Sequence, residues 1–187
     1  MKTLKYIWVF IVCICFSCEE AEELFEEEFD VETTFITELE INVPNDASQD
    51  AVDFQSNLGF WDFRNDPNVV EYLGSPDEIT KIEITEVRYF YKNVVGNNDA
   101  NVVGQIVIVV GQGFDSYDTV QTNLSQADNN NTLFFLSGDF SNTNQALTEL
   151  NAIGFYYEGS VSDNPVSFIT DVSITAKVTI KPDIDNL

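Results

Sequence analysis

Histidine is absent from this 187-residue chain, and cysteine occurs only at Cys13, Cys15 and Cys18. The sequence therefore lacks the commonest general base and the commonest transition-metal ligand. After Cys18 it also lacks a thiol nucleophile, thiolate ligands for zinc and the means to form an internal disulfide. Any bound metal would be a hard, oxygen-liganded cation such as calcium, and any hydrolase would work through carboxylates or such a metal.

Basic residues are scarce as well: eight Lys and Arg stand against 32 Asp and Glu, a formal net charge of −24. Every acidic residue lies after Cys18, where six basic residues remain, so that part of the chain carries a formal charge of −26. Phosphates of nucleic acids and an anionic bilayer surface repel such a chain. The charge suits a solvated surface, divalent cations or a basic partner, and we expect no binding to nucleic acid.

No apolar run is long enough to span a membrane. The longest follows Lys2 and Lys5, covers residues 6–16 and ends before Ser17. At about 1.5 Å per residue it extends about 16 Å, roughly half of a ~30 Å hydrocarbon core. A basic start, an apolar stretch of this length and a small residue after it predict a secretory signal peptide over residues 1–17.

Ser17 and Cys18 resemble the lipobox of bacterial lipoproteins, in which the signal peptide is cut before a cysteine that becomes acylated. Cys15 stands where a lipobox usually has leucine. The resemblance implies lipidation of Cys18, and each buried methylene of the acyl chains would contribute roughly 0.8 kcal/mol to membrane binding. The protein would then be anchored to a membrane without spanning it. The alternative is an ordinary secretory signal that leaves Cys18 as a free thiol.

Residues 18–32 are predicted to form an acidic tether between the lipid and a folded domain. Nine of the fourteen residues from 19 to 32 are Asp or Glu, and such a like-charge run repels itself and stays extended. Glu19, Glu20, Glu22 and Glu23 resemble the export signal that follows the acylated cysteine in surface lipoproteins of Bacteroidetes. This resemblance implies an outer-membrane protein displayed at the cell surface, with the periplasmic face as the alternative.

Residues 33–187 are predicted to form one antiparallel β-sandwich of about seven to eight strands with one or two short helices. Apolar and polar residues alternate over residues 33–43 and 172–180, as they do in half-buried strands. The other expected strands are residues 79–91, 102–110, 119–124, 132–136 and 155–161.

Several local patterns refine this prediction. The apolar phase of residues 79–91 changes midway, so we expect a β-bulge near Thr85 and Glu86. A turn follows this strand, which predicts a hairpin with residues 102–110. That second strand is apolar in both phases and is expected to be central, with Gly104 at a close approach of two strands.

The remaining expectations concern helices and a loop. Helices are expected to start at residues 66–67, where Asp precedes Pro, and at residues 142–143, where Asn and Thr can cap. Gly154 is expected to end the second helix. Residues 111–116 are expected to form a loop.

The whole organisation resembles small β-sandwich lipoproteins of Bacteroidetes. The features that carry the resemblance are the cysteine, the acidic tether, the long strand ITKIEITEVRYFYKNV and the alternating final strand. It covers most of the chain after Cys18, and it implies fold and location only, because many proteins of this kind have no assigned activity.

Two clusters are candidates for ligand binding. The aromatic rings of Phe60, Trp61 and Phe63 beside Arg64 would suit a sugar-stacking platform, although such rings also fill cores. The oxygen-rich turn of Asn97, Asp99 and Asn101 is a candidate calcium site, and residues 128–131 are a second one. Asn and Asp are also the ordinary residues of tight turns, and neither segment has the spacing of an EF-hand loop.

We therefore predict a non-catalytic, membrane-anchored lipoprotein that acts as a binding or structural accessory module at the cell envelope. Its expected partners are the membrane, through the lipid anchor, and a glycan or an envelope protein; calcium is the one cofactor considered. Alternatives are a carbohydrate-binding accessory of a polysaccharide-uptake system, and a carboxylate- or calcium-dependent enzyme. A fimbrial subunit is disfavoured because residues 19–63 contain no Lys or Arg for the trypsin-like processing of such subunits.

Overall fold

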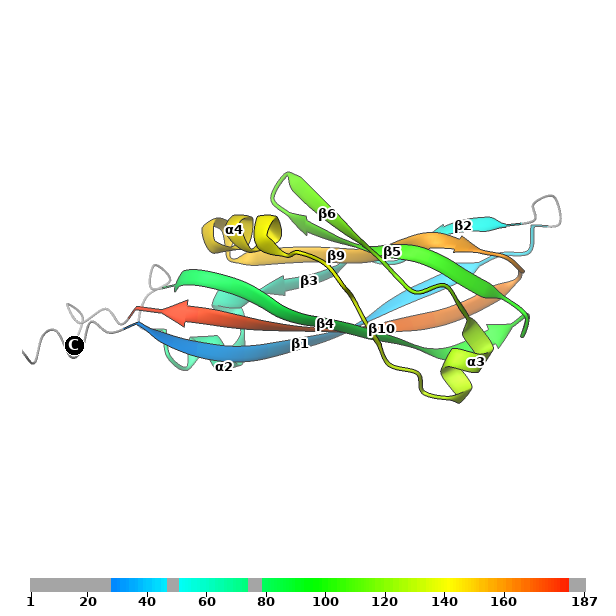
Figure 1. Ribbon diagram of the computed structural model, residues 1–187, viewed down its shortest axis with the longest axis horizontal. Helices are drawn as coiled ribbons and strands as arrows, with labels where there is room; N and C mark the ends of the chain where they lie inside the picture. Colours follow the sequence, from blue (N-terminus) through cyan, green and yellow to red (C-terminus); the bar gives the residue numbers. More distant parts are fainter. Residues whose placement is uncertain (1–27, 47–50, 74–78, 182–187) are drawn as a thin grey trace, which may run out of the picture.

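Two antiparallel β-sheets face each other in the computed structural model, which describes residues 28–46, 51–73 and 79–181 (Figure 1). Sheet A consists, in spatial order, of β1 (Phe29–Val43), β10 (Val166–Ile180), β4 (Ile79–Gly96) and β8 (Phe134–Phe135). Sheet B consists of β2 (Val52–Gln55), β9 (Ala152–Val161), β5 (Asn101–Val110) and β6 (Gly113–Asp118), with β3 (Gly59–Asp62) also paired to β9 and β7 (Thr122–Asn123) to β5. The predicted antiparallel β-sandwich is confirmed.

The helical segments are short. They are η1 (Phe63–Asn65), α2 (Pro67–Val70), α3 (Leu124–Asn129) and α4 (Ser141–Leu150). The start of α2 is as predicted, since the side chain of Asp66 accepts a hydrogen bond from the backbone N–H of Asn68 and Pro67 occupies the first turn. Within the described residues, no helix is long and apolar enough to cross a membrane.

The first and last strands form the longest pairing of the sandwich. β1 pairs with β10 over fifteen residues, from Phe29 opposite Ile180 to Val43 opposite Val166. β1 thus begins four residues before residue 33, the predicted start of the domain, and so overlaps the segment predicted to be an acidic tether. The reason is that Phe29 continues the inward alternation of β1, so the strand extends into the acidic segment without exposing an apolar face.

The predicted β-bulge in β4 is present. Thr175 of β10 lies opposite Glu86, and the next residue, Ala176, lies opposite Ile84, so Thr85 has no partner in the register. The extra residue moves the inward-facing positions of β4 from even to odd numbers, and both Ile84 and Val87 are buried as a result.

The predicted hairpin between β4 and β5 is wrong. β4 pairs with β10 and β8 in sheet A, whereas β5 pairs with β9, β6 and β7 in sheet B. The chain crosses between the sheets after Gly96, which has a positive φ of 119°. A turn in the sequence indicates that the chain reverses, but it does not indicate whether the next strand lies beside the first or across the core from it.

Three other expectations differ from the structure. Residues 113–118 form β6 rather than a loop, because Tyr117 places its ring in the core. Residues 124–129 form α3, where a strand ending at Leu124 was expected, because Asn123 caps a helix through a hydrogen bond to the N–H of Gln126. α4 ends before Asn151, which is left-handed at φ 56°, and Gly154 lies in β9.

Side chains from outside sheet A close both of its edges. The amide oxygen of Asn144 in α4 accepts a hydrogen bond from the backbone N–H of Ile84 in β4 at 2.9 Å. At the opposite edge, the amide oxygen of Asn57 accepts from the N–H of Glu40 in β1 at 2.7 Å. Because these backbone groups are already paired, a further strand is discouraged from adding to sheet A.

Candidate functional site

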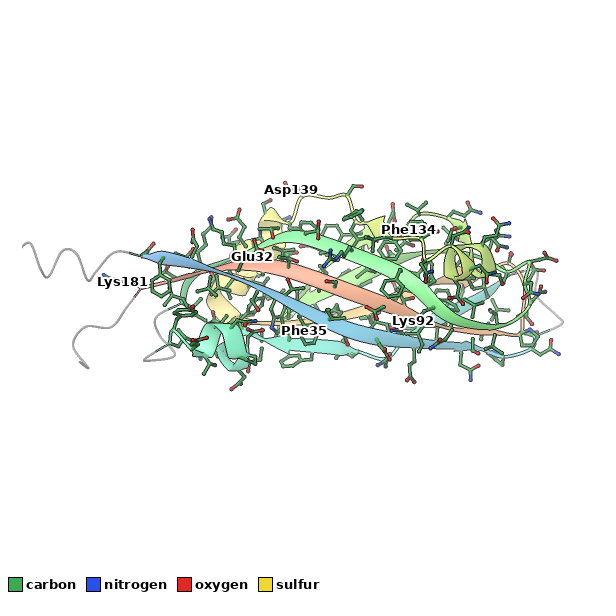
Figure 2. The ribbon with its side chains drawn as sticks, turned by 90° about the horizontal axis from the view of Figure 1, so that it is seen from below. Glu32, Phe35, Lys92, Phe134, Asp139 and Lys181 are labelled. Carbon is green, nitrogen blue, oxygen red and sulfur yellow. The ribbon has the colours of Figure 1, made fainter. Side chains whose placement is uncertain are left out.

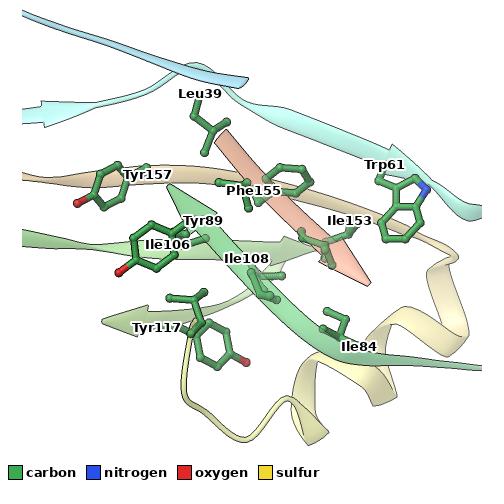
Figure 3. Close-up of a cluster of buried hydrophobic side chains, with 14 of the residues drawn as sticks. Leu39, Trp61, Ile84, Tyr89, Ile106, Ile108, Tyr117, Ile153, Phe155 and Tyr157 are labelled. Atoms are coloured by element: carbon green, nitrogen blue, oxygen red, sulfur yellow. The ribbon is translucent and has the colours of Figure 1, made fainter. Parts of the chain in front are cut away.

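Trp61 lies in the core and not on the surface (Figure 3). Phe63 is buried as well, so the predicted stacking platform is wrong. Trp61 is 2% exposed, stacks on Phe35 with the ring centres 5.4 Å apart, and lies 4.0 Å from the ring of Phe63. Phe60 is 60% exposed, because successive side chains of a strand point to opposite faces. The three rings therefore do not share a surface that a sugar could contact.

Asp66 holds this aromatic cluster in place. One carboxylate oxygen accepts a hydrogen bond from the indole N–H of Trp61 at 3.0 Å, and the other accepts from the hydroxyl of Thr33 at 2.9 Å. A buried indole N–H needs such an acceptor. With the side-chain amide of Asn151 turned so that its oxygen faces Arg64, the guanidinium of Arg64 donates to that oxygen at 3.0 and 3.3 Å, next to the end of α4.

The two candidate calcium segments have structural roles in the fold. The side-chain oxygen of Asn97 accepts from the N–H of Asp99, and the side-chain amide of Asn101 donates to the carbonyl of Asp99, so the turn is hydrogen-bonded within itself. Asp128, in the second segment, accepts from the N–H of Val94 at 2.9 Å. In residues 28–46, 51–73 and 79–181, no group of three or more acidic, His or Cys side chains is placed to hold a metal ion.

A network of phenol groups crosses the core between the sheets. The hydroxyl of Tyr91 in β4 lies 2.9 Å from that of Tyr157 in β9, which lies 3.2 Å from the hydroxyl of Thr119. Tyr89 accepts a hydrogen bond from the N–H of Val120 at 2.8 Å. Burial raises the pKa of Tyr157 to about 12 and raises that of Tyr91 well above its ordinary value. Tyr91 and Tyr157 are fully buried, so they connect the sheets and do not contact a ligand.

The raised tyrosine pKa values predict a loss of stability in alkali. The unfolded chain loses its phenolic protons near pH 10.0, whereas Tyr157 in the folded chain keeps its proton until about pH 12. The free energy of unfolding should therefore be independent of these groups below pH 10.0 and should fall as the pH rises toward 12. Denaturant titrations at a series of alkaline pH values measure this.

Tyr157→Phe provides the matched test of that fall. It should make the decline above pH 10.0 shallower, because one ionisable group with a raised pKa has been removed. At neutral pH the same change should cost about 1–2 kcal/mol, since it removes the buried hydrogen bonds of this hydroxyl with Tyr91 and Thr119. A decline of unchanged steepness would contradict the assignment.

The outer face of sheet A is a surface of paired charges, with β1, β10 and β4 side by side in Figure 2. The ammonium group of Lys92 lies 2.6 Å from the carboxylate of Asp171 and 2.7 Å from that of Glu38. Lys177 lies 3.0 Å from Asp30. Hydrogen bonds to Asp171 and then to Glu38 raise the pKa of Lys92. Lys92 and Lys177 on this face are therefore paired with carboxylates of neighbouring strands.

The outer face of sheet B has a different character. None of its six strands carries a Lys or Arg. Near one end it exposes Phe60 and Phe114, and toward the other it has a shallow depression of about 490 Å³ with Asp53, Asp118 and Glu158 in its lining. Of the surfaces that the structure describes, this one combines exposed aromatic rings with uncompensated negative charge, and it is the candidate binding site.

No protein-family model and no curated protein matches the chain. Three solved structures with similar folds are viral. The decameric BFDV capsid protein has a TM-score of 0.38 at 8% identity, covering 81% of this chain and 99% of that one. Desmodium yellow mottle tymovirus has a TM-score of 0.36 at 7% identity, with 84% and 90% covered. Turnip yellow mosaic virus has a TM-score of 0.34 at 9% identity, covering 85% of this chain and 99% of that one. Likenesses at this level support no inference about what this chain does.

The sequence predictions missed the outer face of sheet B, although one signal for it is present. No Lys or Arg occurs in the 84 residues from Asn93 to Ala176. This segment supplies most of sheet B, so its composition already marks one layer of the sandwich as lacking cations. The aromatic residue that matters there is Phe114, which lay in the segment expected to be a loop. Cys18 and the signal peptide predicted for residues 1–17 lie outside the described residues.

Proposed function

We propose that this protein is a lipoprotein anchored to the outer membrane through acylated Cys18, and that its β-sandwich acts as a non-catalytic binding or structural module at the cell surface. The observation that carries the proposal is the order of residues 1–23: a basic start, an eleven-residue apolar run, Ser17 before Cys18, and then four acidic residues. Display on the periplasmic face is the alternative location.

The geometry of the sandwich is compatible with attachment by one end. Phe29, where β1 begins, lies opposite Ile180, where β10 finishes, and both lie at the same end of the elongated sandwich (Figure 1). Ten residues separate Cys18 from Phe29, and a chain of that length spans at most about 35 Å. A module held in this way keeps the outer faces of both sheets free for contact with a partner.

The surface supports a role in binding rather than in catalysis. Glycoside hydrolysis needs two carboxyl groups at a defined separation across a cleft that holds the sugar. The depression on sheet B is shallow, and Asp53 and Asp118 at its rim are exposed to solvent. The chain also has no histidine to act as a general base.

Cys18→Ala tests the anchor. The variant should lose the incorporation of an alkyne-labelled fatty acid and should move from the membrane fraction to the soluble fraction, because the acyl chains supply the membrane affinity. Cys13→Ala is the matched control, since Cys13 lies in the predicted signal peptide but before the lipobox-like residues 15–18, and this variant should keep the label. Fatty-acid labelling that survives Cys18→Ala would refute the proposed anchor.

Protease treatment of intact cells shows on which side of the outer membrane the domain lies. Cleavage of the domain in intact cells supports surface display. Cleavage only after lysis assigns the domain to the periplasm, provided that the lysed sample is cut under the same conditions.

A further inference from the structure

Apolar side chains form a continuous strip across the outer face of sheet B. In the strand register, Phe60 of β3 lies opposite Gly154 of β9, Gly154 opposite Val109 of β5, and Val109 opposite Phe114 of β6. Phe60 is 60% exposed and Phe114 is 74% exposed. Leu58 completes the strip, because its Cδ1 atom would lie 3.5 Å from a Cβ built on Gly154. These five residues are called the Phe60–Phe114 strip below.

Carboxylates accompany the strip along the strands. Glu158 lies four residues beyond Gly154 in β9, a distance of about 13 Å, and is cross-strand from Gln105, whose amide donates to it at 2.8 Å. Asp118 lies opposite Gln105 in β6, and Asp53 lies in β2. No cation on the strands of sheet B neutralises these groups, in contrast to the paired charges of sheet A.

We infer that this face binds a protein segment whose apolar side chains are flanked by Lys or Arg, an inference that specifies the partner of the binding module proposed above and rests on that proposal. Burial of Phe60 and Phe114 would supply affinity, and the carboxylates would orient a basic segment and speed its association. A second copy of this chain would oppose carboxylates to carboxylates. An anionic membrane surface would be repelled for the same reason.

Isothermal titration calorimetry of the purified full chain with a short peptide of alternating leucine and lysine tests this inference. The peptide should bind, and a peptide of alternating leucine and glutamate should not. Phe60→Ser combined with Phe114→Ser should weaken binding of the leucine–lysine peptide by about tenfold or more, because both rings of the strip are lost. Added salt should weaken binding further, because the carboxylates are exposed.

Ile36→Ser is the matched control. Ile36 is 62% exposed on the outer face of sheet A, so its loss should leave peptide affinity unchanged. Thermal unfolding of each variant checks that the fold is intact. Equal weakening by Ile36→Ser, or no weakening by the double variant, would overturn the inference, as would a dimer of the unmodified chain that the double variant dissociates. These outcomes are independent of fatty-acid labelling at Cys18, so failure of the binding surface and failure of the anchor are distinguishable.

Discussion

Gly159→Ala is expected to destabilise the sandwich strongly. Gly159 of β9 lies opposite Gly104 of β5, and a Cβ on Gly159 would lie 2.2 Å from the carbonyl oxygen of Val103 and 2.6 Å from the Cα of Gly104. Both contacts are with backbone, which cannot rotate aside. The two central strands of sheet B would have to separate, at an expected cost of about 3 kcal/mol or more. Denaturant titration monitored by circular dichroism measures the loss.

Gly113→Ala is the matched control for that experiment. Gly113 also lies in a strand of sheet B, but the nearest atom to its added Cβ is the carbonyl oxygen of Val110 at 3.6 Å, an ordinary contact. This change should be neutral or stabilising by about 0.5 kcal/mol, because alanine restricts the unfolded chain more than glycine does. Similar losses in the two variants would mean that the close approach of β5 and β9 is not the cause.

Trp61→Ala is expected to produce the other large loss, of about 3–5 kcal/mol in the free energy of unfolding. Trp61 is 2% exposed, packs against Phe35 and Phe63, and donates its indole N–H to Asp66. Its removal leaves a cavity between the sheets and a buried carboxylate with one partner fewer. Chemical denaturation measures the change.

Phe60→Ala is the matched control, because it removes an aromatic ring that is exposed rather than buried. Phe60 precedes Trp61 in β3 but faces solvent, with 60% of its surface exposed, so its truncation should change stability by no more than about 0.5 kcal/mol. A well-folded Trp61→Ala variant with unchanged stability would contradict the buried position of the indole ring.

Strand alternation was a reliable guide wherever one face of a strand is buried. The alternation of β10 predicted which of its residues face the core, and the change of phase in β4 predicted the bulge at Thr85. Gly104 was correctly expected at a close approach of strands, because an interior glycine in a strand often marks a place where another backbone comes close. These features depend on neighbours in the sequence and on the pleat of a strand.

The candidate site was not predictable in the same way. The sequence does not distinguish the three aromatic residues Phe60, Trp61 and Phe63. Which of them is buried depends on the register in which β3 pairs with β9. Phe114 gained its exposed position only because β6 pairs with β5. The alternation of apolar and polar residues assigns the side chains of a strand to two faces, but the position of the second sheet determines which face is buried.

The sequence by itself determined the exclusion of histidine and thiol chemistry, the strongly acidic charge, the prediction of an anchor at Cys18 and the two-layer β architecture. The tertiary structure decided that β4 and β5 belong to opposite sheets and that Trp61 is a core residue. It also decided that the lysines of β4 and β10 lie on sheet A, while sheet B is left acidic and apolar. The physical reason is that the pairing of a strand depends on contacts with strands distant in the sequence. This pairing determines which face of each strand is buried in the core and which is exposed to solvent.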